Sequence, residues 1–105
     1  MTSQSAYKLI EKFPSVSVKD HFGSDAFSAN KRIFITLWHE KQEANIRLSP
    51  EKQKEFLETD GDAFSEINNS YGKQGWTKIH LKFIDSKLFE KAARAAWEFS
   101  AVKKK

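Results

Sequence analysis

The segment 76–83 reads WTKIHLKF and shows the clearest strand pattern in the chain. Its Ile79 and Leu81 alternate with charged or aromatic neighbours, a period of two that is typical of a strand with one buried face. The segments 32–38 (RIFITLW) and 43–48 (EANIRL) repeat this alternation. Three amphipathic strands of this kind predict a sheet with one apolar face and one polar face.

Residues with capping ability precede the predicted helices. Ser49 can accept from an orphan amide, Pro50 suits the first helical position and Glu51 complements the helix dipole. Asp85 can cap a final helix in the same way. Pro14 disfavours helical geometry at the residue before it and therefore ends the first helix. The predicted helices cover residues 3–13, 50–59 and 86–102.

The remaining segments complete the predicted order of elements. Short strands are predicted over 26–29 and 63–67, residues 15–25 are predicted to be irregular, and 68–75 is a polar loop. Runs of strands joined by short turns predict a mostly antiparallel sheet with the helices on one face, in the order α-β-β-β-α-β-β-α. We therefore expect a two-layer α+β sandwich that forms a single domain over residues 1–105.

Composition limits the possible functions only loosely. The chain contains nine Phe and three Trp, which suit a compact core, and no Cys, which excludes disulfides and fits a reducing compartment. The N-terminal residues contain no apolar signal region and no segment is long enough to span a membrane, so we expect a cytoplasmic protein without membrane contact. The net charge is +4, but it falls to +1 without the basic tail at 103–105, which holds three lysines.

The sequence contains no recognisable catalytic or metal-binding motif. His21, His39 and His80 lie far apart, and no H-E-x-x-H pattern is present. A G-x-S-x-G elbow is also absent, and the GKQG sequence at 72–75 lacks the spacing of a phosphate-binding loop. We therefore predict no enzymatic activity, no cofactor and no metal. We also expect no cleft in which a nucleophile, a base and an orienting group meet.

Strand alternation assigns the residues of the sheet to two faces. If the regular apolar positions pack beneath the helices, the opposite face combines cations, a histidine and three aromatic rings. The residues predicted beneath the helices are Ile33, Ile35, Leu37, Ile46, Leu48, Ile79, Leu81 and Phe83. The residues predicted on the opposite, open face are Arg32, Phe34, Thr36, Trp38, Asn45, Arg47, Trp76, Lys78, His80 and Lys82.

Three interpretations of this open face remain. Cations between aromatic rings suit a phosphate backbone with stacked bases, which favours nucleic acid, and DNA in particular, as the partner. Exposed aromatic residues and Arg are also enriched at protein interfaces, which favours a protein partner or a second copy of the chain. The third interpretation is an ordinary solvated sheet face, on which long cations cover apolar surface. The residues predicted to contact nucleic acid are Arg32, Trp38, Arg47, Lys73, Trp76, Lys78, His80 and Lys82.

Several motifs resemble the MmcQ/YjbR-like family of small bacterial proteins. The motifs are RIFITLW at 32–38, EANIRLSPE at 43–51, GKQGWT at 72–77 and AAW at 95–97. The resemblance extends over roughly residues 10–102 and implies a fold like that of the type III secretion chaperones, with the layout α-β(3)-α-β(2)-α. It also implies DNA binding, by analogy with the double wing of a phage transcription factor, and it supplies no catalytic residues. Thr77 departs from the family, in which many members have an Asn after the Trp of this strand.

Overall fold

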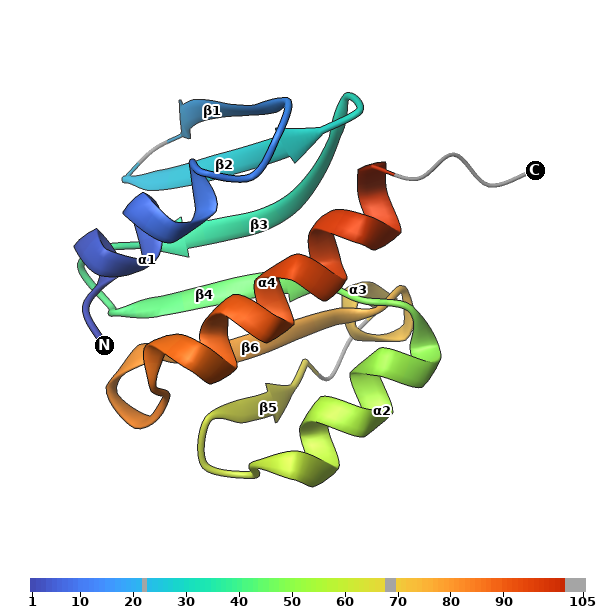
Figure 1. Ribbon diagram of the computed structural model, residues 1–105. Helices are drawn as coiled ribbons and strands as arrows, with labels where there is room; N and C mark the ends of the chain where they lie inside the picture. The colour runs from blue at the N-terminus through green and yellow to red at the C-terminus, as the bar shows by residue number, and fades with distance from the viewer. Residues whose placement is uncertain (22, 68–69, 102–105) are drawn as a thin grey trace.

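The computed structural model describes residues 1–21, 23–67 and 70–101. The basic tail at 103–105, the predicted helix end at residue 102 and the first two residues of the 68–75 loop lie outside these ranges. The described chain forms a six-stranded sheet and a layer of helices (Figure 1). Along the sheet the strands are ordered β1-β2-β3-β4-β6-β5, and all neighbours are antiparallel. Their bounds are β1 (Val16–His21), β2 (Ser24–Ala29), β3 (Arg32–Trp38), β4 (Glu43–Arg47), β5 (Phe64–Glu66) and β6 (Trp76–His80).

The helices after Ser49 and Asp85 begin where these predicted capping residues indicate, whereas the first helix is capped by Thr2 and ends at Ile10, before the predicted residue 13. The helices are α1 (Ser3–Ile10), α2 (Pro50–Thr59), the short α3 (Ser70–Lys73) and α4 (Ser86–Ala101), with a 3-10 turn η1 (Leu81–Phe83). Ser49 Oγ accepts from the amide of Lys52 at 3.3 Å and caps α2, as predicted. Asp85 Oδ1 likewise accepts from the amide of Leu88 at 2.7 Å. These side chains satisfy amides that have no partner within the helix.

The three longer helices pack on the same face of the sheet. Helix α4 crosses the middle strands and α1 lies beside it (Figure 1). Helix α2 reaches the same layer through Phe56, whose ring centroid lies 5.3 Å from that of Phe64. Phe64 pairs with Ile79 across β5 and β6, and directly paired residues share a face. The predicted two-layer α+β sandwich with an antiparallel sheet is therefore confirmed.

A single apolar core fills the space between the two layers. Ile35, Ile46, Ile79 and Leu81 are all fully buried in it, as predicted. Six phenylalanines are also buried there: Phe13, Phe27, Phe34, Phe56, Phe64 and Phe89. Burying one such side chain contributes about 1.5–3 kcal/mol. The core therefore explains why phenylalanine is so frequent in this chain.

One edge of the sheet differs from the prediction. Residues 15–25 were expected to be irregular, but Val16–His21 forms β1 and pairs with β2. Val18 remains 42% exposed, because an edge strand has a neighbour on one side alone. The apolar alternation of β1 is therefore short, and Val16 packs against the core while Val18 stays exposed. The predicted short strand at 26–29 begins earlier, at Ser24.

The strand predicted over 76–83 ends at His80 instead. The chain then turns into η1, and the amide of Leu81 donates to the carbonyl of Gln42 at 3.1 Å. Leu81 stays buried, but Phe83 is 63% exposed. The prediction that Phe83 packs beneath the helices is wrong, because alternation no longer applies once the strand has ended.

A β-bulge changes the faces at the start of β3. Phe27 pairs with Ile35, whereas its neighbour Ser28 pairs with Ile33, so Phe34 is an extra residue in β3. Phe34 is fully buried in the core and Ile33 is 45% exposed. The prediction placed Ile33 beneath the helices and Phe34 on the open face, and both assignments are wrong. The inserted residue reverses the alternation on its N-terminal side.

Candidate nucleic-acid interface

One row of paired residues crosses all six strands on the open face of the sheet, the face opposite the helices. We call it the central row, and from β1 to β5 it contains Lys19, Ala26, Thr36, Asn45, Lys78 and Ser65. Directly paired residues in a sheet point to the same side. Lysine side chains therefore stand toward the two ends of the row, with smaller side chains between them.

Aromatic side chains lie on both sides of the central row. On one side, Trp38 pairs with Glu43, which in turn pairs with His80. The exposed ring of Phe83 lies 6.4 Å from the His80 ring, centroid to centroid. On the other side, Trp76 pairs with Arg47 at the end of β4. Trp38 and Trp76 are both half-buried, so each keeps part of its surface available for contact.

Polar side chains around Lys78 form a linked group. Its Nζ lies 3.8 Å from Glu43 Oε1, and Glu43 Oε2 lies 3.8 Å from His80 Nδ1. The other ring nitrogen of the histidine, Nε2, is hydrogen-bonded to Ser65 Oγ at 2.7 Å. The Lys78 side chain is 39% exposed, so this ion pair is loose and partly solvated. Glu43 therefore offsets part of the positive charge at this end of the central row.

A hollow with a volume of about 380 Å³ opens within this group. The residues lining it are Asn45, Ser65, Glu66, Ile67, Lys78 and His80. Asn45 Oδ1 is inaccessible to solvent and accepts no hydrogen bond from any residue in the described ranges. A buried carbonyl oxygen is normally paired with a donor. Within the described chain, Asn45 Oδ1 is therefore an unsatisfied acceptor that solvent in the hollow does not reach.

The structure brings some of the predicted contact residues together and separates others. Trp38, Lys78 and His80 lie on the open face, while Trp76 and Arg47 lie toward its end. The Arg47 guanidinium is also 5.7 Å from the centre of the Phe99 ring on α4, and its Nε donates to the carbonyl of Gln74 at 3.4 Å. Arg47 is therefore held at the end of the sheet.

Three predicted cations lie away from the middle of the face. Arg32 pairs with Ala29, a buried core residue, so the bulge places it on the helix side by register. Lys73 is the last residue of α3. Lys82 lies in η1, beyond the end of β6, whereas the prediction placed it in the sheet.

Sequence patterns missed several residues of this surface. Lys19 was assigned to an irregular segment, although the alternation of Val16 and Val18 just before it is a strand signal. Phe83 was assigned to the core. Glu43 and Ser65 carry no motif, and their positions around Lys78 follow from the pairing of strands that are distant in the sequence.

A second polar cluster lies on the helix side, where α1 meets the turn after β3. His39 Nε2 is hydrogen-bonded to Asp25 Oδ2 at 2.6 Å, and its Nδ1 to Ser3 Oγ at 2.8 Å. A serine, a histidine and a carboxylate therefore lie within hydrogen-bond distance of one another, with the serine buried rather than open to a cleft. Gln42 completes the cluster, because its Nε2 donates to Ser3 Oγ at 3.0 Å and its Oε1 accepts from the Ser3 amide at 2.9 Å.

This cluster holds α1 on the sheet. The Asp25 carboxylate accepts from His39 Nε2, and Ser3 Oγ, which also accepts from Gln42, is hydrogen-bonded to His39 Nδ1. The Ser3 side chain is 2% exposed, which leaves no approach for a substrate carbonyl. The hydrogen-bonded chain thus anchors α1 to β2 and to the turn between β3 and β4.

Neither a metal-ligating cluster nor a membrane-spanning helix is found among the described residues. Within the described residues, no group of three or more His, Cys, Asp or Glu side chains is placed to hold a metal ion. None of the described helices has both the length and the apolar character that a membrane span requires.

The fold and the open face define a small α+β domain built on a six-stranded antiparallel sheet. The YjbR family model matches residues 11–99, and the chain belongs to the YjbR family. This confirms the family predicted from the motifs. No curated protein matches the chain. The crystal structure of the Deinococcus radiodurans protein DR2400, which has a DUF419 domain, is similar with a TM-score of 0.74 and 11% sequence identity. The alignment covers 93% of this chain and 77% of that protein, and it supports the fold alone.

Proposed function

We propose that the protein binds single-stranded nucleic acid through the open face of its sheet. The observation that carries the proposal is the combination of lysines in the central row with aromatic side chains on both sides of it. Lysines neutralise phosphates, and aromatic rings stack with unpaired bases. No described helix covers this face (Figure 1).

The width of the sheet favours a single strand over a duplex. Neighbouring strands lie about 4.8 Å apart, so six strands span roughly 24 Å. The major groove of B-DNA is about 12 Å wide and admits a helix or a two-stranded ribbon. A six-stranded face is too wide to enter it, whereas an extended single strand can lie across such a sheet.

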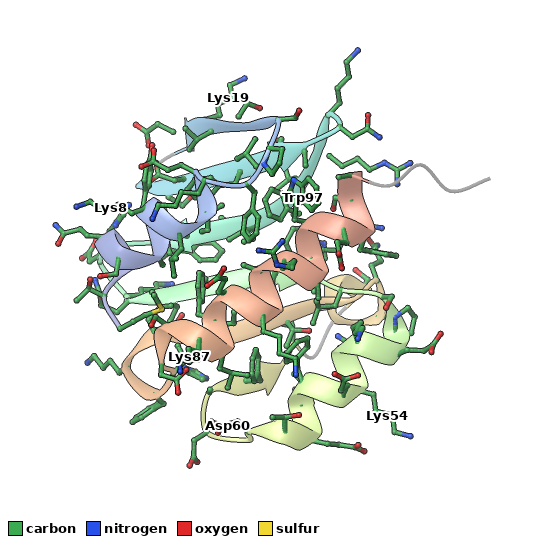
Figure 2. The ribbon with its side chains drawn as sticks, in the orientation of Figure 1. Lys8, Lys19, Lys54, Asp60, Lys87 and Trp97 are labelled. Atoms are coloured by element: carbon green, nitrogen blue, oxygen red, sulfur yellow. The ribbon has the colours of Figure 1, made fainter. Side chains whose placement is uncertain are left out.

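Salt dependence of binding tests this proposal. The double variant Lys19→Gln and Lys78→Gln removes the two cations of the central row. If each contacts one phosphate, affinity for single-stranded DNA falls for every base sequence, and the slope of log K against log salt decreases by about 1.4. The matched control is Lys54→Gln with Lys87→Gln, which removes the same charge from α2 and α4 (Figure 2). The control is expected to leave the slope nearly unchanged.

The basic tail at 103–105 must be neutralised in every chain that is compared, because three lysines bind polyanions without a specific site. Replacing them with Ser keeps the length of the protein. If the full chain with a neutral tail shows no affinity for single-stranded DNA or RNA at low salt, the proposal is refuted.

A protein partner is the second candidate, and two exposed apolar residues favour it. Ile33 is 45% exposed and Phe83 is 63% exposed. Exposed apolar side chains of this size are common at protein interfaces. An apolar interface depends weakly on ionic strength, so a partner retained at high salt would support this alternative.

A further inference from the structure

Strand β1 leaves one edge of the sheet open (Figure 1). Among the described strands it pairs with β2 alone, along all six of its residues. The strand at the opposite edge, β5, has three residues and offers a shorter edge. The backbone N–H and C=O groups along an open edge can form a ladder with a further strand. Strand β1 is therefore the edge at which this sheet can be extended.

The direction of the backbone groups along β1 follows from the ladder of the sheet. The Leu48 amide donates to the Gly75 carbonyl at 2.9 Å, and these two residues continue the register of β4 with β6, so they form a hydrogen-bonded pair. Hydrogen-bonded and non-hydrogen-bonded pairs alternate, and a residue that bonds one neighbouring strand directs its groups away from the other. This alternation continues through β3 and β2 to β1. The residues whose backbone groups point to the open edge are Val16, Val18 and Asp20.

Two copies of β1 match when Val18 lies at the centre of the pair. Val18 pairs with a buried residue of β2, so its side chain stands on the helix side, and it is 42% exposed at the edge. In an antiparallel pair with a two-fold axis through Val18, the two Val18 side chains face each other. Val16 then faces Asp20 of the second copy, and Ser17 faces Lys19 of the second copy. The residues directed to the edge all lie opposite one another, so three pairs exchange about six backbone hydrogen bonds.

Other centres give poorer pairs. A centre on Lys19 places two lysines directly opposite each other, and a centre on Asp20 does the same for two carboxylates. Like charges directly opposite each other in a sheet are destabilising. A centre on Ser17 places Asp20 opposite Pro14, which has no amide to donate. Val18 is therefore the centre that the residue types favour.

We infer that two copies of the chain pair through β1 and form one continuous antiparallel sheet of twelve strands, with Val18 on the two-fold axis. Both copies use the same edge, so the assembly closes at two chains instead of growing into a filament. The inference is independent of the proposed function. Because the axis is normal to the sheet, both open faces lie on one side of the dimer. The two Lys19 Cα atoms then lie roughly 8 Å apart on that side.

Sedimentation equilibrium of the full chain, freed of nucleic acid, tests the inference. We expect the mean mass of the native protein to rise from one chain to two between micromolar and millimolar concentration. Val18→Pro removes an amide that points to the open edge. Proline is tolerated on an edge strand where its nitrogen faces solvent, so the variant should keep a native circular dichroism spectrum and stay a monomer throughout.

A change of charge tests the register of the pair. Ser17→Glu places a carboxylate opposite Lys19 of the second copy, and the two-fold axis creates this ion pair twice. We expect the dissociation constant of the dimer to fall at least about twofold. Ser28→Glu is the matched control, because Ser28 pairs with Ser17 on the same face but lies one strand inside the edge. It should not tighten the dimer.

Hydrogen exchange of the backbone amides locates the interface. The amide of Val18 should exchange more slowly as the protein concentration rises, whereas the amide of Lys19 is already bonded to β2 and should change little.

Three results would overturn the inference. A native chain that remains a monomer at millimolar concentration overturns it and leaves the proposed function standing, because no nucleic acid is present in the experiment. A dimer that persists in folded Val18→Pro places the interface elsewhere. Equal dissociation constants for Ser17→Glu and Ser28→Glu overturn the register, and this comparison holds even if Val18→Pro does not fold.

Discussion

The orphan acceptor at Asn45 predicts an unusual effect on stability. Asn45→Val replaces a polar side chain in the middle of β4 by a β-branched apolar one. A buried acceptor without a partner costs about 1–3 kcal/mol, and this cost is removed in the variant. The better strand propensity of Val adds up to about 1 kcal/mol. We therefore expect the free energy of unfolding to rise by about 1–3 kcal/mol.

Urea denaturation of the native and variant chains measures this difference. The midpoint should rise with an unchanged m-value, because the surface exposed on unfolding stays nearly the same. For a domain of this size, a gain of 1 kcal/mol corresponds to roughly 4 °C or more in the melting temperature. Thr36→Val separates the propensity term, since the site is the direct neighbour of Asn45 in the central row.

A loss of stability on Asn45→Val would refute the reasoning. So would a gain no larger than that of Thr36→Val, because Asn45 Oδ1 would then cost nothing in the free protein. Either result means that the oxygen has a hydrogen-bond donor in the folded protein.

Three further predictions concern separate features. Gly75→Ala should lower the free energy of unfolding by about 3 kcal/mol or more, because Gly75 has φ of +102° and a Cβ would lie 1.9 Å from the Leu48 carbonyl oxygen. Gly61→Ala, with open space around it, is the control and should change the free energy of unfolding by less than about 0.5 kcal/mol in the same urea titration. Phe83→Ala should weaken binding of single-stranded DNA by about 1–3 kcal/mol in a fluorescence anisotropy titration and leave the melting temperature of the protein nearly unchanged. A large drop in the melting temperature would contradict the exposed position of the Phe83 side chain. Trp97→Phe (Trp97 is labelled in Figure 2) should lower the free energy of unfolding by about 1 kcal/mol, because it removes the 3.0 Å hydrogen bond from the indole to the carbonyl of Pro14. An unchanged free energy of unfolding would show that this bond does not stabilise the fold.

The regular parts of the fold could be predicted because their signals are local. Segments such as 43–48 alternate with a period of two, and Ser49 and Asp85 cap helices through contacts three residues away. The bulge at Phe34 could not be predicted in this way, because a one-residue insertion depends on the register with β2. The end of β6 at His80 is likewise set by a contact with the distant Gln42.

In the candidate site, too, some features follow from local sequence and others from contacts between distant segments. Alternation correctly placed Lys78 and His80 on the open face with Trp38. The unpaired acceptor was visible in the sequence as one Asn in a strand, but its lack of a partner depends on β3 and β6 lying beside β4. Pairing between distant segments therefore determines which residues form the site.

The two polar clusters of this protein differ in one physical respect. In the cluster of Ser3, His39, Asp25 and Gln42, the described polar atoms have partners, and the side chains join α1 to the sheet. The structural role of such a satisfied network is enough to explain its presence in the folded protein. Around Asn45, in contrast, the folded chain leaves an acceptor unpaired on the face that the described helices leave open. An unpaired buried acceptor of this kind lowers stability, and Asn45→Val is expected to raise it for that reason.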